Sequence, residues 1–385
     1  MRILLIAPQP FYEDRGTPIA VRDTLSVMSQ LGFQVDLATF PIGTEITFPG
    51  VQVLRTANPL RFKSVPVGLS FRKIVLDIGL FAKVLRLFYR NRYDCIHAVE
   101  EGAAMALICK ALSGIPVIYD MQSSMPEQLR KFKVFKEGPG RWLSLQFERW
   151  LVSNADYIVS SIGLAPRIQS IQPEKKVLES FFEGCDFRPR DENLAKSLGS
   201  FGRPTVVYTG TFASYQGLEH LMAAAALVRE EIPEVIFILV GGTEAEIARL
   251  SSWLTKYKLE NNVKLHRRLP RQEIPDYIAL ADILVLPRIS GENAPLKIYD
   301  YMKSGKPIVA TGIPAHRAML TDETAVLVEP NIEGLSKGIL LALQNTDYAK
   351  KVATAAQNSL QAEENKPLKE TISEAYSLVL GKSSD

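Results

Sequence analysis

The sequence predicts two doubly wound α/β domains that face each other across a cleft. A chain of 385 residues is too long for one ordinary hydrophobic core. Short unbroken apolar segments, typical of parallel strands covered on both faces, alternate with amphipathic segments. This pattern stops at the polar stretch CDFRPRDENLAKSLGSFGRP and then starts again. We therefore expect domains at 1–187 and 205–363, a linker at 188–204, and a last helix within 364–385 that returns to the first domain.

The first half opens with a strand–loop–helix–strand unit. Residues 3–7 form an unbroken apolar run, and the loop PQPFYEDRGTP follows it. An amphipathic helix is expected over 19–31, ended by Gly32, before a second strand at 34–39. This order is typical of a βαβ unit. Further strands are expected at 94–97, 116–120 and 156–159.

The second half repeats this organisation. A strand at 205–209 leads into Gly210 and a helix from about Leu218, and the apolar run 235–240 ends in Gly241-Gly242. Further strands are expected at 263–266, 283–286, 308–310 and 325–328. In open parallel sheets ligands bind beyond the carboxyl ends of the strands. The loops after Ala7, Thr209, Val240 and Leu286 are therefore the predicted binding region.

Composition excludes several classes of protein. With 46% hydrophobic and 23% charged residues, the chain is globular, and a net charge of +3 does not by itself indicate nucleic acid. Three scattered cysteines without a CxxC spacing predict neither a disulfide framework nor a zinc site. The opening MRILLIAPQP is too short to be a signal peptide, and no segment has the ~20 apolar residues of a membrane span. We therefore expect a cytoplasmic protein.

The segment GENAPLKIYDYMKSGKPIVAT, residues 291–311, carries the clearest chemistry. Pro295 suits the first turn of a helix, and Gly305 is placed to end that helix before a strand. Lys297 and Asp300 then lie on the first turns, and Glu292 lies in the loop before them. The free amides of a helix start attract an anion such as a phosphate. A solvated helix face with ordinary loop carboxylates is the alternative interpretation.

These positions predict a phosphate held between two helix starts. Gly210-Thr211 precedes the other helix start, and Gly16 can bring the backbone of the first domain close to a ligand. Asp300 can accept hydrogen bonds from a ribose diol, as carboxylates do in dinucleotide folds. Glu292 can hold hydroxyls of the group attached to the phosphate.

The chain resembles a family 4 glycosyltransferase of the type with two Rossmann domains (GT-B) over nearly its whole length. The family's Glu-x7-Glu motif appears as Glu292-x7-Asp300. VYTGTFASYQGLEHLMAA resembles the segment that opens the family's second domain, and YDCIHAVEEGAAMALICKALSGIPVIYDMQSSMPEQL resembles its acceptor-domain core. The resemblance implies transfer of a sugar, with retained anomeric configuration, from a UDP- or GDP-linked donor to a glycolipid or saccharide acceptor of the cell envelope. It implies no metal and no cofactor, and the sequence contains no Asp-x-Asp.

Some positions depart from the family's pattern. The second acid is Asp300 rather than Glu, and the His often found after Asp120-Met121 is Gln122. The usual Arg and Lys of the phosphate loop fall at about Thr211 and Gln216. Available substitutes are Lys297, Arg288, and Arg267 or Arg268.

The predicted site is therefore the following. The catalytic residues are Glu292, Lys297 and His97, although a core histidine is an equally simple interpretation of His97. The donor-binding residues are Gly16, Gly210, Thr211, Gln216, Gly241, Arg267, Arg268, Arg288, Asn293, Ala294, Leu296 and Asp300. Glu100 and Glu101 can orient an acceptor hydroxyl, or they form a solvated helix start.

Two other functions remain open. One is a nucleotide-sugar epimerase of the same architecture, and the other is a non-catalytic subunit that binds a nucleotide-sugar. A dehydrogenase is disfavoured because PQPFYEDRGTP lacks GxGxxG.

Residues 61–92 combine eight basic side chains and one acid with many large apolar residues, and 129–142 forms a second basic cluster. This pattern predicts attachment to an anionic membrane surface, on the inner face of the cell membrane. An amphipathic helix packed on the sheet, with a basic outer face, is the alternative. Nucleic acid is a poorer fit, because no recognition motif accompanies the charge.

Overall fold

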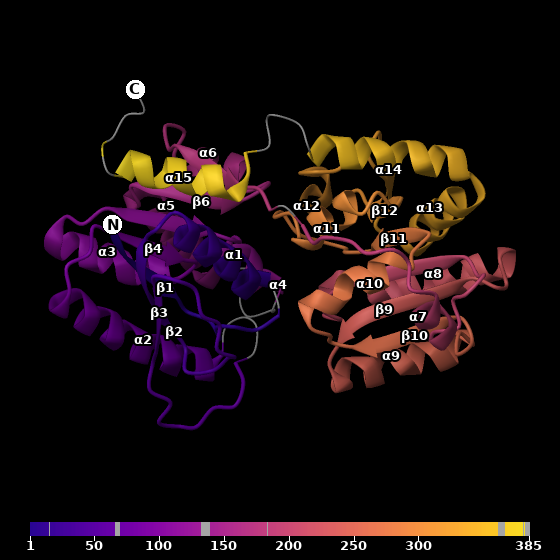
Figure 1. The fold of residues 1–385 in the computed structure, drawn as a ribbon, viewed down its shortest axis with the longest axis horizontal. Coiled ribbons are helices and arrows are strands. Elements are labelled where there is room, and N and C mark those ends of the chain that lie inside the picture. Colours follow the sequence, from indigo (N-terminus) through magenta and orange to yellow (C-terminus); the bar gives the residue numbers. More distant parts are fainter. Residues whose placement is uncertain are drawn as a thin grey trace. The chain divides into compact units, whose positions relative to one another are not determined.

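The computed structural model describes residues 1–14, 16–65, 70–131, 139–182, 184–360, 366–379 and 381. The chain divides into two compact units (Figure 1). The first contains Met1–Phe181 together with Lys366–Asp385, and the second contains Phe182–Asn365. Each unit is described by itself.

The first unit is built on a parallel sheet whose strand order is β3-β2-β1-β4-β5-β6-β7. Its strands are β1 (Arg2–Ala7), β2 (Gln34–Thr39), β3 (Val51–Arg55), β4 (Cys95–Val99), β5 (Val117–Met121), β6 (Tyr157–Ser161) and β7 (Val177–Ser180). Its helices are α1 (Gly16–Gln30), α2 (Phe71–Arg90), α3 (Gly102–Ser113), α4 (Met125–Lys131), α5 (Pro139–Asn154), α6 (Ala165–Ile171) and α15 (Leu368–Val379). The strand order reverses direction between β1 and β4, which is where such sheets form their ligand crevice.

The second unit has a parallel sheet of order β10-β9-β8-β11-β12-β13. Its strands are β8 (Thr205–Thr209), β9 (Ile236–Gly242), β10 (Val263–Arg267), β11 (Ile283–Leu286), β12 (Ile308–Thr311) and β13 (Val326–Val328). Its helices are α7 (Glu192–Ser197), α8 (Leu218–Glu231), α9 (Glu244–Tyr257), α10 (Ile274–Ala279), α11 (Lys297–Lys303), α12 (Pro314–Arg317), α13 (Ile332–Gln344) and α14 (Thr346–Leu360), with 3₁₀ turns η1 (Ser214–Gln216) and η2 (Arg271–Glu273). Here the order reverses between β8 and β11, so the expected binding edge lies at their carboxyl ends.

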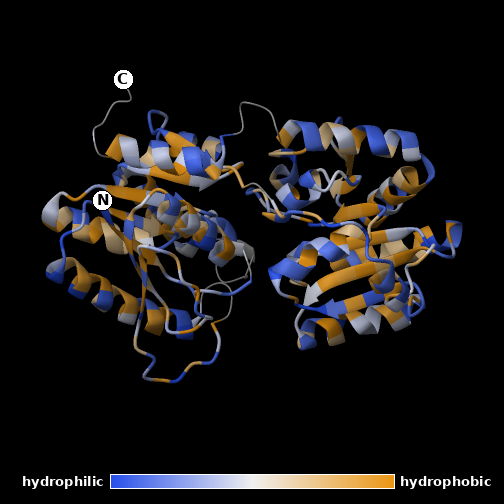
Figure 2. Cartoon of the chain, in the orientation of Figure 1, coloured by the Kyte–Doolittle hydropathy of each residue, from blue (hydrophilic) through white to orange (hydrophobic). Residues whose placement is uncertain are grey.

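Apolar strands fold this way because both faces of each sheet are covered. In the first unit, Leu4 and Ile6 of β1 pack with Leu76 and Leu80 of α2 in one buried cluster. The cores appear in Figure 2 as orange strands between mixed helices. The predicted fold class, two doubly wound α/β domains, is confirmed.

The predicted linker 188–204 is wrong as a structural boundary. It contains α7, which Asp191 caps by accepting hydrogen bonds from the amides of Asn193 and Leu194. Ala195 and Leu198 bury their side chains in a core cluster of the second unit. The segment is polar because most of its side chains are exposed to solvent, and polarity alone does not distinguish such a surface segment from a linker. The first unit accordingly ends at Phe181 rather than at 187.

In the described part of the chain, no helix is both long enough and apolar enough to cross a membrane.

Candidate functional site

Two glycines bring the ends of β8 and β9 into close contact in the second unit. Gly210 has φ +130° and Gly241 has φ +126°, a region that favours glycine. The amide of Gly210 donates to the carbonyl of Val240 at 2.8 Å. A Cβ on Gly241 would overlap the carbonyl of Gly210. Both the backbone angles and this close approach therefore require glycine at these two positions.

Lys297, the first residue of α11, points its ammonium group at this edge. The Nζ atom lies 3.9 Å from the centroid of the Tyr208 ring, and a Cβ on Gly210 would overlap it. The Nζ atom is buried and has no hydrogen-bond partner among the described residues. Burial, followed by the charge of Arg288, lowers the pKa of Lys297 well below its usual value. An anion at this place would supply the missing partner.

Arg288, just after β11, holds the loop that carries Glu292. Its Nε donates to the carbonyl of Ser290 at 2.7 Å, and one Nη donates to the carbonyl of Asn293 at 3.3 Å. Gly291 has φ +145°, and a Cβ there would overlap the guanidinium. Arg288 is only 6% exposed, so it frames the loop and places a positive charge near Lys297.

His316 on α12 also lies near Lys297 and Arg288, although no sequence motif marks it. Its side chain is fully buried, and Nδ1 lies 2.8 Å from the carbonyl oxygen of Thr311, which can only accept. Burial is the main reason why the pKa of His316 falls to about 4. The hydrogen bond to the Thr311 carbonyl raises this pKa, and the charges of Arg288 and Lys297 lower it. The imidazole is therefore neutral at pH 7, with its proton on Nδ1. Its Nε2 is a buried acceptor without a partner among the described residues.

Asp300 of α11 forms a hydrogen bond with the first residues of the second unit. Its Oδ1 accepts a hydrogen bond from the amide of Cys185 at 2.7 Å and lies 3.6 Å from the Arg271 guanidinium. The residue is 5% exposed. Asp300 thus has a structural contact in addition to the ribose contact predicted from the sequence.

The other predicted donor residues of this unit lie around the same edge. Thr211 accepts at its carbonyl from the Tyr208 hydroxyl at 2.8 Å, and Gln216 is buried in η1. Ala294 is buried, whereas Glu292, Asn293 and Leu296 are half-buried in the loop before α11. Arg267 and Arg268 are exposed at the end of β10, where the Arg268 amide donates to the Gly242 carbonyl at 3.0 Å. They lie beyond β9, on the far side of it from Lys297.

The helix that contains Lys297 begins two residues later than the predicted start at Pro295. It ends at Lys303, shortly before Gly305, which has φ +66°. The 3₁₀ turn η1 comes between Gly210 and α8, so α8 begins at Leu218, as predicted.

His97 lies in the core of the first unit. It is fully buried in β4, with Nδ1 2.9 Å from the Tyr376 hydroxyl and Nε2 3.4 Å from Asp120 Oδ2. Gln122 donates to the other oxygen of Asp120 at 2.5 Å. Both ring nitrogens of His97 therefore have partners inside the unit, which is the arrangement of a core histidine.

Gly16 is the first residue of α1 and is exposed. A Cβ built there would have no atom within 4 Å, so no close approach of backbone requires glycine at this position.

A residue with an unusual backbone conformation lies at the carboxyl edge of the sheet in the first unit. Glu100, directly after β4, has φ +50°, which is uncommon for a residue other than glycine. It accepts a hydrogen bond from the Ser123 hydroxyl at 2.8 Å. Burial, followed by the charge of Glu101, raises the pKa of Glu100 well above its usual value. Glu101 itself forms an ion pair with Lys73.

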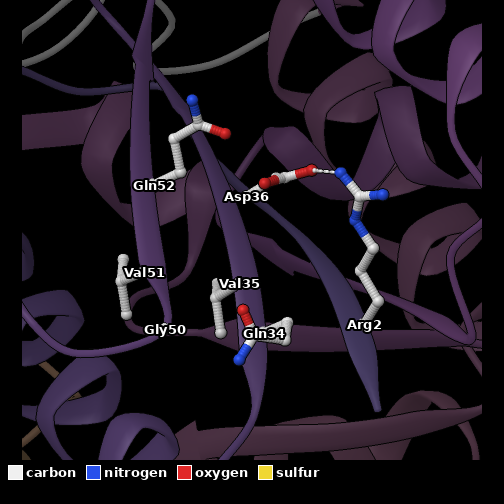
Figure 3. Close-up of a pocket in the computed structure, with 7 residues that line it drawn as sticks. All are labelled: Arg2, Gln34, Val35, Asp36, Gly50, Val51 and Gln52. Atoms are coloured by element: carbon white, nitrogen blue, oxygen red, sulfur yellow. Dashed lines mark hydrogen bonds and ion pairs between the residues drawn. The ribbon is translucent and has the colours of Figure 1, made fainter.

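A hollow of about 440 Å³ in the first unit lies at the opposite, amino edge of the sheet (Figure 3). Arg2 and Asp36 form an ion pair of 2.8 Å beside it. This hollow therefore lies at the other end of the strands from Glu100. Within the residues that the structure describes, no group of three or more His, Cys, Asp or Glu side chains is placed to hold a metal ion.

Comparison with known families covers most of the chain. The family "Glycosyltransferase Family 4" matches residues 15–161, and "Glycosyl transferases group 1" matches residues 190–359. A phosphatidyl-myo-inositol mannosyltransferase from Mycobacterium leprae is 22% identical over 92% of this chain and 91% of its own length. An alpha-D-kanosaminyltransferase from Streptomyces kanamyceticus is 26% identical over 39% of this chain, and the match spans only 38% of that relative's length.

Solved structures share the fold. A sucrose-phosphate synthase from Thermosynechococcus elongatus superposes with a TM-score of 0.82 at 18% identity, covering 100% of both chains. The Anabaena protein HepE, solved in complex with UDP-glucose, gives a TM-score of 0.73 at 17% identity over 99% of this chain and 100% of its own.

Proposed function

Because the chain belongs to the family 4 glycosyltransferases of the GT-B type, we propose that it transfers a sugar from a nucleotide-sugar to a lipid-linked or cell-envelope polysaccharide acceptor. A UDP- or GDP-linked donor is proposed. The Anabaena neighbour solved with UDP-glucose supports a nucleotide-sugar, and the mannosyltransferase relative supports a lipid-borne acceptor.

The observation that carries the proposal is the ammonium group of Lys297, which is buried against the Tyr208 ring and has no hydrogen-bond partner among the described residues. Removing an ion from water without a counter-charge costs several kcal/mol, so such a group is rarely kept for stability alone. A diphosphate oxygen beside Lys297 would offset this cost and restore the ordinary charge of the amine. In this arrangement Lys297 takes the place of the basic residues that the phosphate loop lacks at Thr211 and Gln216.

The proposed reaction retains the anomeric configuration. The bond between the sugar C1 and the diphosphate oxygen breaks, and the acceptor hydroxyl oxygen bonds to C1 on the same face. The hydroxyl proton passes to the oxygen of the leaving diphosphate. Lys297 stabilises the charge on that leaving group, Glu292 holds hydroxyls of the sugar, and Asp300 binds the ribose. We expect neither a metal nor a cofactor in this reaction.

The test is calorimetric titration of UDP and of GDP in the presence of EDTA. Lys297→Met keeps the length of the side chain and removes its charge, so the nucleotide that binds should lose at least tenfold in affinity. Lys303→Met, on the same helix but paired with Asp186, is the matched control. Unchanged affinity in Lys297→Met would overturn the assignment, as would binding that requires a divalent ion. Mass spectrometry of lipid extracts incubated with a panel of nucleotide-sugars then identifies the donor and the product.

We further propose that the protein works as a peripheral enzyme on the inner face of the cell membrane. A lipid-borne acceptor would require access to a membrane surface.

A further inference from the structure

Large apolar side chains are exposed on the outer surface of three helices of the first unit, α2, α3 and α5. On α2, Phe71 is 72% exposed and Tyr89 is 71% exposed, with Ile78 between them. Leu112 on α3 and Trp142 on α5 are each 59% exposed. We call this surface the apolar layer.

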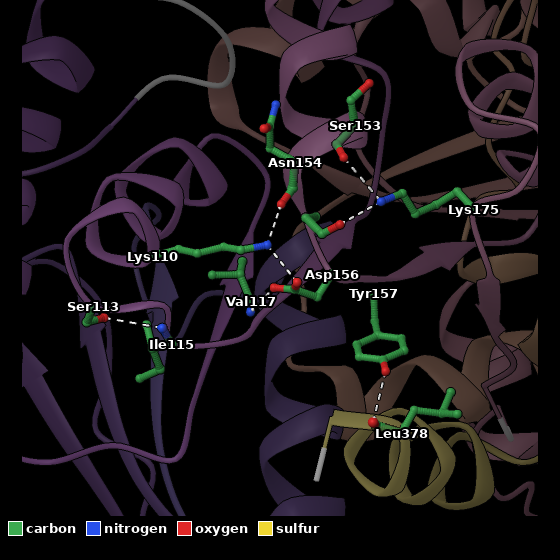
Figure 4. Close-up of polar contacts among 11 residues, drawn as sticks. Lys110, Ser113, Ile115, Val117, Ser153, Asn154, Asp156, Tyr157, Lys175 and Leu378 are labelled. Carbon is green, nitrogen blue, oxygen red and sulfur yellow. Dashed lines mark hydrogen bonds and ion pairs between the residues drawn. The ribbon is translucent and has the colours of Figure 1, made fainter. Parts of the chain in front are cut away.

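The three helices that carry these side chains are neighbours in the first unit. α2 contacts α3, and α3 contacts α5. Lys110 of α3 donates to the carbonyl of Asn154, the last residue of α5, at 2.9 Å (Figure 4). The same Nζ lies 2.6 Å from Asp156 Oδ1. At the other end of α3, Glu101 pairs with Lys73 of α2.

The fold does not need these outward side chains. The face of α2 that packs on the sheet is supplied by Leu76, Leu80 and Val84, which are buried. Phe71 and Tyr89 lie on the opposite side of the helix and remain mostly exposed. Apolar surface that a soluble domain leaves exposed in one place marks an interaction site.

The charge of the apolar layer is one-sided. The helices carry five basic residues on α2, one on α3 and two on α5, against a single acid each on α2 and α5. Glu148 of α5 is buried and bound to Arg167, and Asp77 of α2 has a buried oxygen. The exposed charges are therefore positive.

The structure also shows which basic residues are available. Lys73 is paired with Glu101, and the Nζ of Lys83 donates to the carbonyl of Arg55 at 2.5 Å. Both are therefore engaged in the first unit. The exposed basic residues are Arg72, Arg86, Arg90, Arg141 and Arg149, of which Arg72 donates a hydrogen bond to the Ser64 carbonyl at 3.4 Å. Of the basic stretches predicted from the sequence, residues 66–69 and 132–138 lie outside the described part of the chain.

We propose that the apolar layer docks on a bilayer containing anionic lipids, with the arginines on the headgroups and the aromatic side chains in the interface. Trp and Tyr side chains favour that depth, and basic residues near an anionic surface attract it additively. A second copy of this chain fits poorly, because pairing through the same face would oppose the arginines of the two copies, and the described residues of the three helices include no exposed acid. Docking deepens the proposed function by supplying access to a lipid-borne acceptor, but the binding itself does not depend on glycosyl transfer.

The test is co-sedimentation of the full chain with phosphatidylcholine vesicles, with and without 30% phosphatidylglycerol. The wild type should bind only the anionic vesicles in 50 mM salt and weaken as salt rises. Arg86→Ser with Arg90→Ser and Arg149→Ser should lower vesicle affinity by about a hundredfold. Phe71→Ser with Ile78→Ser and Trp142→Ser should weaken binding at every salt concentration.

Matched controls lie in the second unit. The triple variant Lys337→Ser, Lys350→Ser and Lys351→Ser removes three exposed charges there and should bind like the wild type. Leu227→Ser with Leu341→Ser is the control for exposed apolar residues. Circular dichroism melting and nucleotide affinity should not change in any variant, which separates this proposal from the donor site. A wild type that ignores anionic vesicles in low salt, or arginine variants that bind normally, would overturn the proposal.

Discussion

At His316 a buried neutral imidazole donates one nitrogen's proton to the Thr311 carbonyl, and its other nitrogen has no partner among the described residues. The folded pKa of about 4 lies below the ordinary 6.5, so the unfolded chain binds the proton more tightly. The stabilisation is therefore complete above pH 6.5 and is lost as the pH falls from 6.5 toward 4. Between pH 7.5 and 4.5, His316 should cost the second unit about 2–3 kcal/mol of unfolding free energy.

Denaturant unfolding of the wild type and of His316→Asn at those two pH values measures this term. Asn keeps a donor for the Thr311 carbonyl but does not titrate, so the variant should lose less stability on acidification. Equal losses in both proteins would mean that His316 titrates normally in the folded state.

Asp300 combines two roles that two substitutions separate. Asp300→Ala removes the acceptor of the Cys185 amide and should lower stability as well as nucleotide affinity, each by about 1–3 kcal/mol. Asp300→Asn keeps an oxygen for that amide but removes the charge, so stability should largely return while UDP or GDP affinity stays low. Wild-type nucleotide affinity in Asp300→Asn, by calorimetry, would leave Asp300 with its structural contact alone.

At the scale of elements, apolar runs predicted most strands well. The predicted first and last residues agree with the structure for β2, β8 and β11. Each of these strands is buried and is bounded by polar residues or turns. β3 and β7 were not predicted. β3 ends in Arg55 and is only partly buried, and β7 alternates, so neither has the unbroken apolar run of an inner strand.

Residues of the candidate site could be predicted where a local sequence motif contains them. They could not be predicted where their role depends on how they are buried in the fold. Lys297 and Glu292 could be predicted as site residues because residues close to them in the sequence determine the helix start and the loop before it. His316 and His97 look alike in sequence, each being a lone histidine close to a strand. Only packing shows that His97 has partners on both ring nitrogens, whereas Nε2 of His316 has none in the described part of the chain.

At the scale of the whole molecule, the chain leaves the first unit after Phe181 and returns to it at Lys366. The returning helix α15 is integral to that unit. Tyr376 contacts His97 at 2.9 Å, and Tyr157 of β6 donates to the carbonyl of Leu378 at 2.9 Å. Ile372 is fully buried. The first unit therefore cannot complete its core until the second unit has been synthesised.

This discontinuity predicts a selective effect of substitutions in α15. Ile372→Ala should destabilise by about 2–4 kcal/mol, because it leaves a cavity in the first unit. Hydrogen exchange should then speed up in β6 and β7, while β8 and β9 keep their protection. Ile339→Ala, equally buried in the second unit, should give the reverse pattern. If either substitution accelerates exchange in both units to the same degree, the units unfold as one cooperative body, and α15 stabilises the whole chain rather than the unit on which it packs.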